Sequence, residues 1–167
     1  MAMHSLQKSV LFALSLVFAS VSALATPPLF DQIEISAQKG RLHHNAQGWM
    51  SLPESETLRS MRIAERCSAM GGPRGKFSVA DGSLWLTGVY RCGGDIPLSA
   101  VYPQSASHLL ADWVTGDLTA ELGKVICQSR DGFPIFERIA SLSVQAGRVT
   151  QLSYQESGVE QCAREMP

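Results

Sequence analysis

The chain has 167 residues, with 14 lysines and arginines against 15 aspartates and glutamates, which gives a formal net charge of −1. This length suits one domain with one hydrophobic core. Because the chain contains no basic run and no stripe of alternating aromatic and basic residues, binding to nucleic acid through charge is set aside.

The N-terminal segment has the three parts of a secretory signal peptide. Lys8 supplies a positive charge, residues 10–19 are uncharged and apolar, and Ala23-Leu24-Ala25 places small residues where signal peptidase reads them. An apolar run of about 10 residues is too short for the roughly 20 that a membrane-spanning helix needs. We therefore predict a signal helix in residues 1–25, cleaved after Ala25. The mature domain, residues 26–167, is then periplasmic or secreted and has no integral membrane segment.

All four cysteines lie in the predicted mature domain. Their even number, their wide spacing and the export signal favour disulfides, which persist in oxidising compartments. Structural zinc is the competing interpretation, but the chain lacks the Cys-x-x-Cys pair that such sites favour. Three pairings are open. We favour sequential pairing because it closes the shorter loops, which gives Cys67–Cys92 and Cys127–Cys162.

The first part of the mature domain predicts two short strands. Residues 33–37 alternate apolar and polar side chains, as a half-buried strand does. Lys39-Gly40 supplies a break in the chain. Residues 49–52 form a second candidate strand, which Pro53 ends.

The following segment, residues 55–67, fits two structures. Leu58 and Met61 have helical spacing, and Ser55 suits the start of a helix. The apolar residues also fit the alternation of a strand, and we favour a strand that ends at Cys67.

The clearest local prediction is a β-hairpin with Asp81-Gly82 as its turn. This dipeptide accepts the positive φ angles that a type I′ turn requires. The turn pairs Val79 with Leu84 and Phe77 with Leu86, so the four apolar residues share one face. Trp85 falls on the opposite face, where it packs against a second layer, lies at an edge or is exposed for binding.

The segment after the hairpin contains two interruptions. Residues 92–97, with two consecutive glycines, predict a strand end and an abrupt change of direction rather than a phosphate cradle. Residues 105–113 predict one or two helical turns.

The C-terminal half predicts further strands. Residues 118–122 alternate, and the strand extends to Cys127 past a bulge near Gly123-Lys124. Another strand covers residues 135–139. Ala146-Gly147 is the turn of a last hairpin, and its hydrophobic register requires a bulge or a longer loop.

Many short strands, glycine-rich turns and few helical patterns are typical of an all-β fold. We predict a single antiparallel β-sandwich or partly closed barrel, with one or two short helical turns, after the N-terminal signal helix.

Several short motifs from Gly75 onward form a recognisable series. They are Asp81 to Leu86 (DGSLWL), Ala111 to Leu118 (ADWVTGDL), Gly123-Lys124, Phe136-Glu137-Arg138 and Gly147-Arg148-Val149. This series resembles a family of uncharacterised small bacterial β-rich proteins. The resemblance covers about half of the mature domain, implies a compact β-fold and supplies no active site. The cysteines are not part of its pattern.

The histidines do not predict a metal or catalytic site. His43 and His44 are adjacent, so on a strand they point to opposite faces and do not readily share a metal ion. His108 lies near Ser105, Ser107 and Asp112. A Ser-His-Asp triad, however, needs groups that converge beside an oxyanion hole. The chain also lacks a G-x-S-x-G nucleophile motif. We expect a surface histidine, no metal and no cofactor.

Tryptophans and turn carboxylates offer candidate ligand contacts. A glycosidase would need two carboxylates about 5–10 Å apart across a cleft, and the candidates are Asp95, Asp112, Asp117 and Asp131. Aspartates in turns are commoner than catalytic ones. Asp112 is expected to cap backbone N–H groups while Trp113 anchors the next strand. The candidate ligand-binding residues are Trp85, Trp113 and Asp112.

These patterns favour a non-enzymatic exported β-domain that binds an unknown protein or envelope component, or serves as an accessory envelope protein. Two alternatives stay open. One is a small hydrolase acting on carbohydrate or cell-wall material, with Trp49, Trp85 and Trp113 stacking on sugar rings. The other is a periplasmic inhibitor or immunity protein that presents an exposed apolar patch at residues 133–136.

Overall fold

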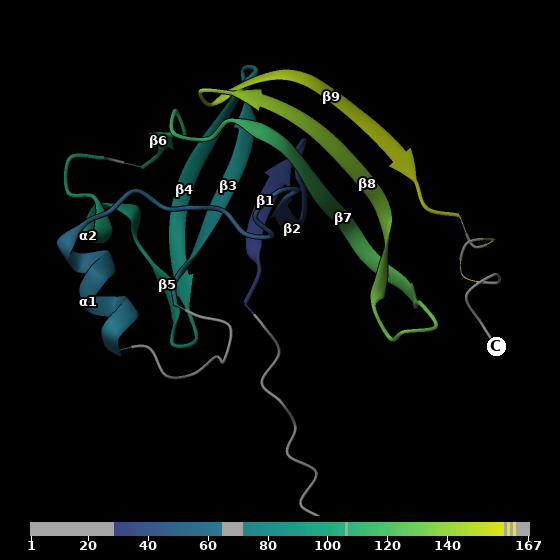
Figure 1. The fold of residues 1–167 in the computed structure, drawn as a ribbon, viewed down its shortest axis with the longest axis horizontal. Helices are drawn as coiled ribbons and strands as arrows, with labels where there is room; N and C mark the ends of the chain where they lie inside the picture. Colours follow the sequence, from purple (N-terminus) through teal and green to yellow (C-terminus); the bar gives the residue numbers. More distant parts are fainter. Residues whose placement is uncertain (1–28, 65–71, 106, 159, 161, 163–167) are drawn as a thin grey trace, which may run out of the picture.

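Most of the described chain is β-structure, as predicted (Figure 1). The computed structural model describes residues 29–64, 72–105, 107–158, 160 and 162. The predicted signal peptide, its cleavage site and Cys67 lie outside these residues. The elements are β1 (Asp31–Ile35), β2 (Gln38–His44), α1 (Glu56–Ala64), β3 (Arg74–Ala80), β4 (Ser83–Arg91), β5 (Gly94–Ile96), α2 (Leu98–Val101), β6 (Leu109–Leu110), β7 (Gly116–Gln128), β8 (Pro134–Gln145) and β9 (Arg148–Glu156). No helix among the described residues is long and apolar enough to cross a membrane.

The strands form one sheet that curls into a partly closed barrel. Their order is β3-β1-β2-β7-β8-β9-β4, and β4 also pairs with β3, which completes the ring. The short strands β5 and β6 both pair with β4. The sheet is mixed rather than purely antiparallel, because β1 and β3 run parallel. After β2 the chain crosses over through α1 before it returns beside β1, and such a crossover is what a parallel pair needs.

Two hairpin turns close the barrel by bonding to each other. The β3–β4 turn has φ angles of 52° at Asp81 and 64° at Gly82, and the β8–β9 turn has 46° at Ala146 and 75° at Gly147. The Leu84 N–H donates to the Gly147 carbonyl at 2.8 Å, and the Val149 N–H donates to the Gly82 carbonyl at 3.0 Å. The β4–β9 ladder itself holds one pair, Ser83 opposite Arg148. This seam therefore depends on the conformation of both turns.

The predicted β3–β4 hairpin is confirmed. Val79 lies opposite Leu84, Ser78 opposite Trp85 and Phe77 opposite Leu86. Phe77, Leu84 and Leu86 are all buried. The turn chemistry of Asp81-Gly82 and the hydrophobic alternation specify the same register, so local sequence suffices here.

The first strand ends earlier than predicted, at Ile35, and forms a hairpin with β2. Ser36 and Ala37 form its turn, with φ angles of 49° and 66°, so Lys39-Gly40 is no break but part of β2. Gly40 serves close packing instead: a Cβ at this position would lie 1.9 Å from the Glu121 carbonyl oxygen on β7. The positive φ angles at two non-glycine residues are held by the β1–β2 pairing, which local sequence does not reveal.

The strand predicted for residues 55–67 is wrong, because Glu56–Ala64 forms the helix α1. The Ser55 hydroxyl accepts the Leu58 N–H at 3.0 Å, which is an N-cap contact. Leu58 is fully buried, so helical periodicity rather than alternation places it in the core. Residues 49–52, also predicted as a strand, form no regular element.

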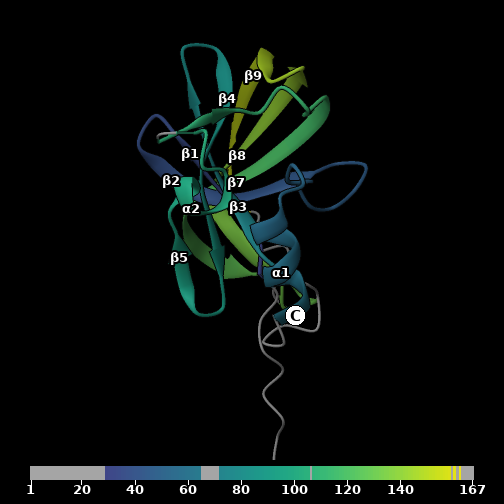
Figure 2. The ribbon, with the colours of Figure 1, turned by 90° about the vertical axis from the view of Figure 1, so that its left-hand side faces the viewer.

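The short helix lies elsewhere than predicted. Residues 98–101 form α2, whereas Leu109–Leu110 in the predicted helical segment is β6. Leu98 and Val101 are buried, and α2 packs beside α1 at one end of the barrel, away from the β8–β9 turn (Figure 1, Figure 2). The predicted change of direction at residues 92–97 is a tight hairpin between β4 and β5.

The last three strands follow the prediction and are longer. The β7 register shifts between Leu122 and Val125 and again before Cys127, which are the expected irregularities. The β8–β9 register shifts beside Val144, which is the bulge that the Ala146-Gly147 turn required.

The core fills the barrel and continues under the two helices. Its largest fully buried side chains are Ile33, Leu42, Leu58, Phe77, Leu84, Leu86, Leu118, Leu122 and Leu142. Among the residues whose burial the structure describes, one buried acidic or basic side chain occurs. Asp31 is 1% exposed, and its two carboxylate oxygens accept the N–H groups of Met50 and Gly75, each at 2.8 Å. Asp31 thus ties the connection after β2 and the start of β3 to β1.

The predicted Cys127–Cys162 disulfide is present. It joins β7 to the segment after β9 across a sequence separation of 35. Cys92 is also disulfide-bonded. Its predicted partner, Cys67, is outside the described residues, so that pairing stays a prediction.

Candidate functional site

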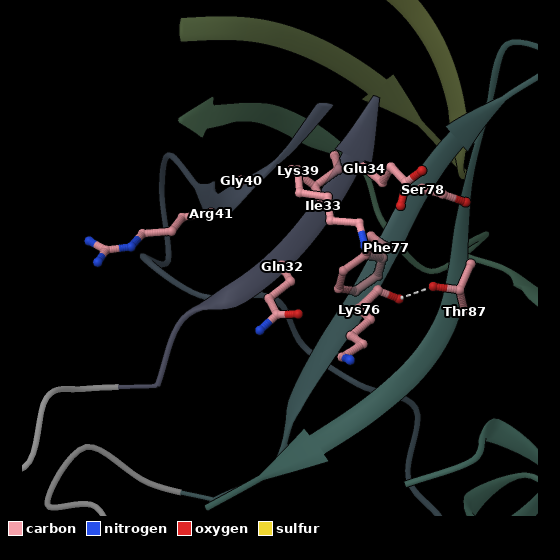
Figure 3. Close-up of a pocket in the computed structure, with 10 residues that line it drawn as sticks. All are labelled: Gln32, Ile33, Glu34, Lys39, Gly40, Arg41, Lys76, Phe77, Ser78 and Thr87. Carbon is pink, nitrogen blue, oxygen red and sulfur yellow. Dashed lines mark hydrogen bonds between the residues drawn. The ribbon is translucent and has the colours of Figure 1, made fainter. Parts of the chain in front are cut away.

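A hollow lies on β1, β2, β3 and β4. We call it the outer groove; its volume is about 650 Å³. Figure 3 shows its lining residues, which are Gln32, Ile33, Glu34, Lys39, Gly40, Arg41, Lys76, Phe77, Ser78 and Thr87. Most of the residues that line it are polar, and the buried core residues Ile33 and Phe77 also contribute to its lining.

Strand alternation produces this polar surface. In β1, Gln32 and Glu34 are exposed on either side of buried Ile33. The parallel register places Gln32 beside Lys76 and Glu34 beside Ser78. Residues that are more than 40 positions apart in sequence therefore meet on one face.

A bulge and a glycine interrupt the regular β3–β4 ladder beside the outer groove. The β3–β4 register shifts between Lys76 and Phe77, and Lys76 lies opposite Gly88. A Cβ at Gly88 would lie 3.6 Å from the Lys76 side chain, so the glycine leaves room for that side chain across the ladder. The Thr87 hydroxyl donates to the Lys76 carbonyl at 3.1 Å, which Figure 3 shows as a dashed line. This hydrogen bond therefore connects β3 and β4 at the point where their register shifts.

Trp85 stands at one end of this surface. A second hollow of about 330 Å³, the Trp85 hollow, is lined by Ser78, Ala80, Asp81, Trp85, Thr87, Ser107 and His108. Ser78 and Thr87 also line the outer groove, so the two hollows adjoin. The Trp85 indole N–H donates to the Ala80 carbonyl at 3.2 Å, and His108 packs edge-to-face on the ring with centroids 4.8 Å apart. The indole is therefore held in place.

Both signs of charge occur along the outer groove. Lys76 Nζ lies 2.5 Å from Asp95 Oδ2 and 5.9 Å from the centre of the Tyr90 ring. Glu34 and Lys39 are directly opposite each other on β1 and β2, and both are exposed. The arrangement supplies ammonium, carboxylate, amide and hydroxyl groups to a ligand lying along the strands.

Ser107 and His108 form a hydrogen bond of 2.9 Å between Oγ and Nδ1. Both residues are exposed. Asp112, which would be the third member of a Ser-His-Asp triad, does not line the Trp85 hollow. Ser107 and His108 are therefore a pair of surface residues beside Trp85, without Asp112.

Trp113 and Asp112, predicted with Trp85 as ligand contacts, lie outside both hollows. The Trp113 indole N–H donates to the Ser51 carbonyl at 2.8 Å, and its ring packs against the core. Trp113 thus anchors the connection to β7. The Asp112 side chain is exposed, and the nearby Val114 N–H donates to the Ala111 carbonyl rather than to this carboxylate. The predicted cap at Asp112 is therefore not formed at Val114.

The other candidate residues are dispersed. Asp95 pairs with Lys76, Asp117 accepts the Ser143 hydroxyl at 2.8 Å, and Asp131 is exposed in the β7–β8 turn. In the patch proposed at residues 133–136, Phe133 is 69% exposed but Phe136 is buried.

The two adjacent histidines are separated by their contacts. His43 Nε2 bonds to Glu121 Oε2 at 3.3 Å, and His44 Nδ1 accepts the Ala46 N–H at 3.2 Å. Among the described residues, no group of three or more potential metal-ligating side chains occurs. Trp49 is half exposed and lines a separate hollow of about 230 Å³ with Arg74.

Comparisons with protein-family models, with curated proteins and with solved structures find no match for this chain. The resemblance from Gly75 onward therefore stays a prediction. Sequence reasoning singled out Trp85 but missed Gln32, Glu34, Lys39 and Lys76. The sequence did show that Gln32 and Glu34 are the polar residues of an alternating strand. They line a groove only because β3 pairs alongside β1, and the sequence pattern does not reveal that pairing.

Proposed function

We propose that this protein is an exported, non-enzymatic binding protein that holds an extended carbohydrate ligand in the outer groove and the Trp85 hollow. The observation that carries the proposal is that these two hollows adjoin through Ser78 and Thr87. Together they place a fixed aromatic ring at the end of a polar channel. Ligand sites commonly combine such a hollow with a small number of placed polar groups.

The chemistry of the surface suits sugars. A sugar ring has C–H faces that pack on an aromatic ring and hydroxyl groups that both donate and accept hydrogen bonds. Trp85 supplies the ring, and Gln32, Ser78 and Thr87 supply amide and hydroxyl groups. Lys39 and Glu34 add charged hydrogen-bonding groups, which bond more strongly than neutral ones.

Export is supported by two independent features. The N-terminal residues have the order of a signal peptide. The Cys127–Cys162 disulfide is of a kind that persists in oxidising compartments. An envelope or extracellular polysaccharide would be within reach of such a protein.

The test uses the mature protein and two insoluble glycans, purified peptidoglycan and chitin. We expect co-sedimentation with at least one of them, and at least tenfold weaker retention for W85A. The matched control is W49A, which removes a half-exposed tryptophan that lines a separate hollow and should bind as wild type does. Absence of retention on both glycans, or equal retention of W85A and wild type, would overturn the proposal.

A second variant separates ring loss from misfolding. Thr87→Val keeps the shape of the side chain but removes the hydroxyl that faces both hollows. Retention should fall while the protein stays folded, because loss of the hydrogen bond from Thr87 to the Lys76 carbonyl costs only about 1 kcal/mol. N-terminal sequencing of protein from a periplasmic extract should begin at Thr26, and a chain that begins at Met1 would contradict export by cleavage.

A further inference from the structure

Among the described strands, none pairs with the outer edge of β9 along most of its length. β8 pairs with β9 from Arg148 to Glu156, whereas β4 meets it at the single pair Ser83–Arg148. Beyond this pair, no described strand lies beside residues 150–156, and Figure 1 shows β9 as the outermost strand of its arm. Every second residue of that stretch therefore turns its backbone N–H and C=O away from the sheet.

The described residues after β9 are directed to the other side. The Ser157 N–H donates to the Glu137 carbonyl on β8 at 2.9 Å. Cys162 is then bonded to Cys127 on β7. This path leads from β9 back across β8, so these residues leave the outer edge of β9 open.

Devices that usually protect an edge strand are sparse in β9. Proteins commonly place lysine, proline or a bulge along a free edge. Residues 150–156 read TQLSYQE, with one charge at the end, and the bulge is confined to Thr150 at the start of this stretch. Leu152 and Tyr154 are 36% and 45% exposed and share one face of β9. Arg138 lies 5.4 Å from the Tyr154 ring centre and orders it.

We propose that this edge pairs with β9 of a second copy of the chain, antiparallel and about a two-fold axis. In an antiparallel pair, residues directly opposite each other lie on the same face of the sheet, whereas successive residues of one strand lie on opposite faces. The two-fold axis must therefore place one residue of β9 opposite the same residue of the partner. The centre of the free stretch is Ser153. This register places Leu152 opposite the partner's Tyr154 and Gln151 opposite the partner's Gln155.

The pairs in this register are complementary. Aliphatic–aromatic pairs across strands stabilise a sheet, and each of the two Leu152 side chains gains a tyrosine neighbour. Two glutamine amides face each other as donor and acceptor, and the two Ser153 hydroxyls meet at the axis. The contact is smaller than a standard interface of about 1,600 Å², so the dimer is expected at micromolar or weaker affinity.

The sharpest test is a disulfide at the axis. Opposite Cα atoms in an antiparallel pair are about 4.5–5.5 Å apart, which suits a disulfide. We expect Ser153→Cys to form a covalent dimer under mild oxidation. The control Gln151→Cys faces the partner's Gln155 and should stay monomeric on the same gel. Equal cross-linking of both variants, or none with S153C, would overturn this register.

Sedimentation equilibrium of the wild-type mature protein tests the dimer itself. We expect the apparent mass to rise toward twice that of one chain as the concentration increases to about 1 mM. Ser153→Lys sets two like charges opposite each other and should weaken the dimer at least about tenfold. A wild-type protein that stays monomeric over the range would overturn the proposal. W85A should dimerise as wild type does, which separates this result from the ligand proposal.

Discussion

The buried carboxylate of Asp31 accepts the backbone N–H of Gly75 at 2.8 Å, across 44 residues of sequence. Its second oxygen accepts the Met50 N–H. In Asp31→Asn the new amide group can accept only one of these two hydrogen bonds, so one buried N–H loses its partner. We expect the free energy of unfolding to fall by about 1–3 kcal/mol. Urea denaturation measures this, with the exposed Asp112→Asn as the control that should change by less than about 0.5 kcal/mol.

The same carboxyl affects the pH dependence of stability with an unusual sign. Burial raises the pKa of Asp31, and the hydrogen bonds from Met50 and Gly75 offset part of that effect. The folded protein therefore holds the proton more tightly than the unfolded chain does. The stabilisation is fully present below the unfolded pKa of about 4 and is lost as the pH rises through the folded pKa. The stability of wild type relative to D31N should thus decrease from about pH 4 upward, and an increase would contradict this assignment.

Tyr102 should lose its hydroxyl proton at a higher pH than an ordinary tyrosine does. Its hydroxyl donates to the Pro53 carbonyl at 2.7 Å, and burial raises its pKa to about 12. Because the unfolded chain loses this proton near pH 10, the stabilisation from Tyr102 is present below that pH and is lost between about 10 and about 12. Tyr102→Phe should remove this pH dependence and cost about 1 kcal/mol at neutral pH. An absorbance titration should lose one tyrosine equivalent at the alkaline end, whereas Y154F should leave that step intact.

Gly40 should tolerate no larger residue. An added Cβ would lie 1.9 Å from the Glu121 carbonyl oxygen, so β2 and β7 would have to separate. We expect Gly40→Ala to lower the free energy of unfolding by about 3 kcal/mol or to prevent folding. The control is Gly93→Ala, whose Cβ would come no closer than 3.8 Å to its nearest neighbour, the Arg91 Nε. Similar stability of G40A and G93A would contradict the close approach of these strands.

The Cys127–Cys162 bond should contribute a large part of the stability. Its sequence separation of 35 corresponds to about 3–4 kcal/mol if it acts by restricting the unfolded chain. The double variant C127S/C162S, unfolded in urea without reductant, should lose about this amount. Cys162→Ser alone should lose nearly as much, because either change removes the same bond. Additive losses from the two single variants would show that the cysteines act separately.

Local chemistry accounts for what the sequence could predict. The turns at Asp81-Gly82 and Ala146-Gly147 fix φ angles within two residues, so both hairpins were identified. The Ser36-Ala37 turn has the same backbone form without glycine, and strand pairing imposes it. The helix at residues 56–64 was ambiguous because its short apolar pattern fits two periods, and the Ser55 cap and the burial of Leu58 decide between them.

The candidate site was largely hidden for a different reason. Trp85 could be assigned from its hairpin alone to the face opposite Phe77 and Leu86. The groove beside it needs Gln32 and Lys76 as neighbours, and this contact arises from a parallel pairing across a crossover. No periodicity within β1 or β3 specifies which strand lies alongside.

The reciprocal bonds between Gly82 and Val149, and between Leu84 and Gly147, have a consequence for the order of folding. Each hairpin can form from nearby residues, but these bonds join positions more than 60 residues apart, so ring closure must follow both hairpins. A slip of one residue in either hairpin would turn its core side chains outward and move its glycine carbonyl away from the acceptor position. The hydrogen bonds between the two turns can therefore form only when both hairpins have their native register, so closure of the barrel selects against misaligned hairpins.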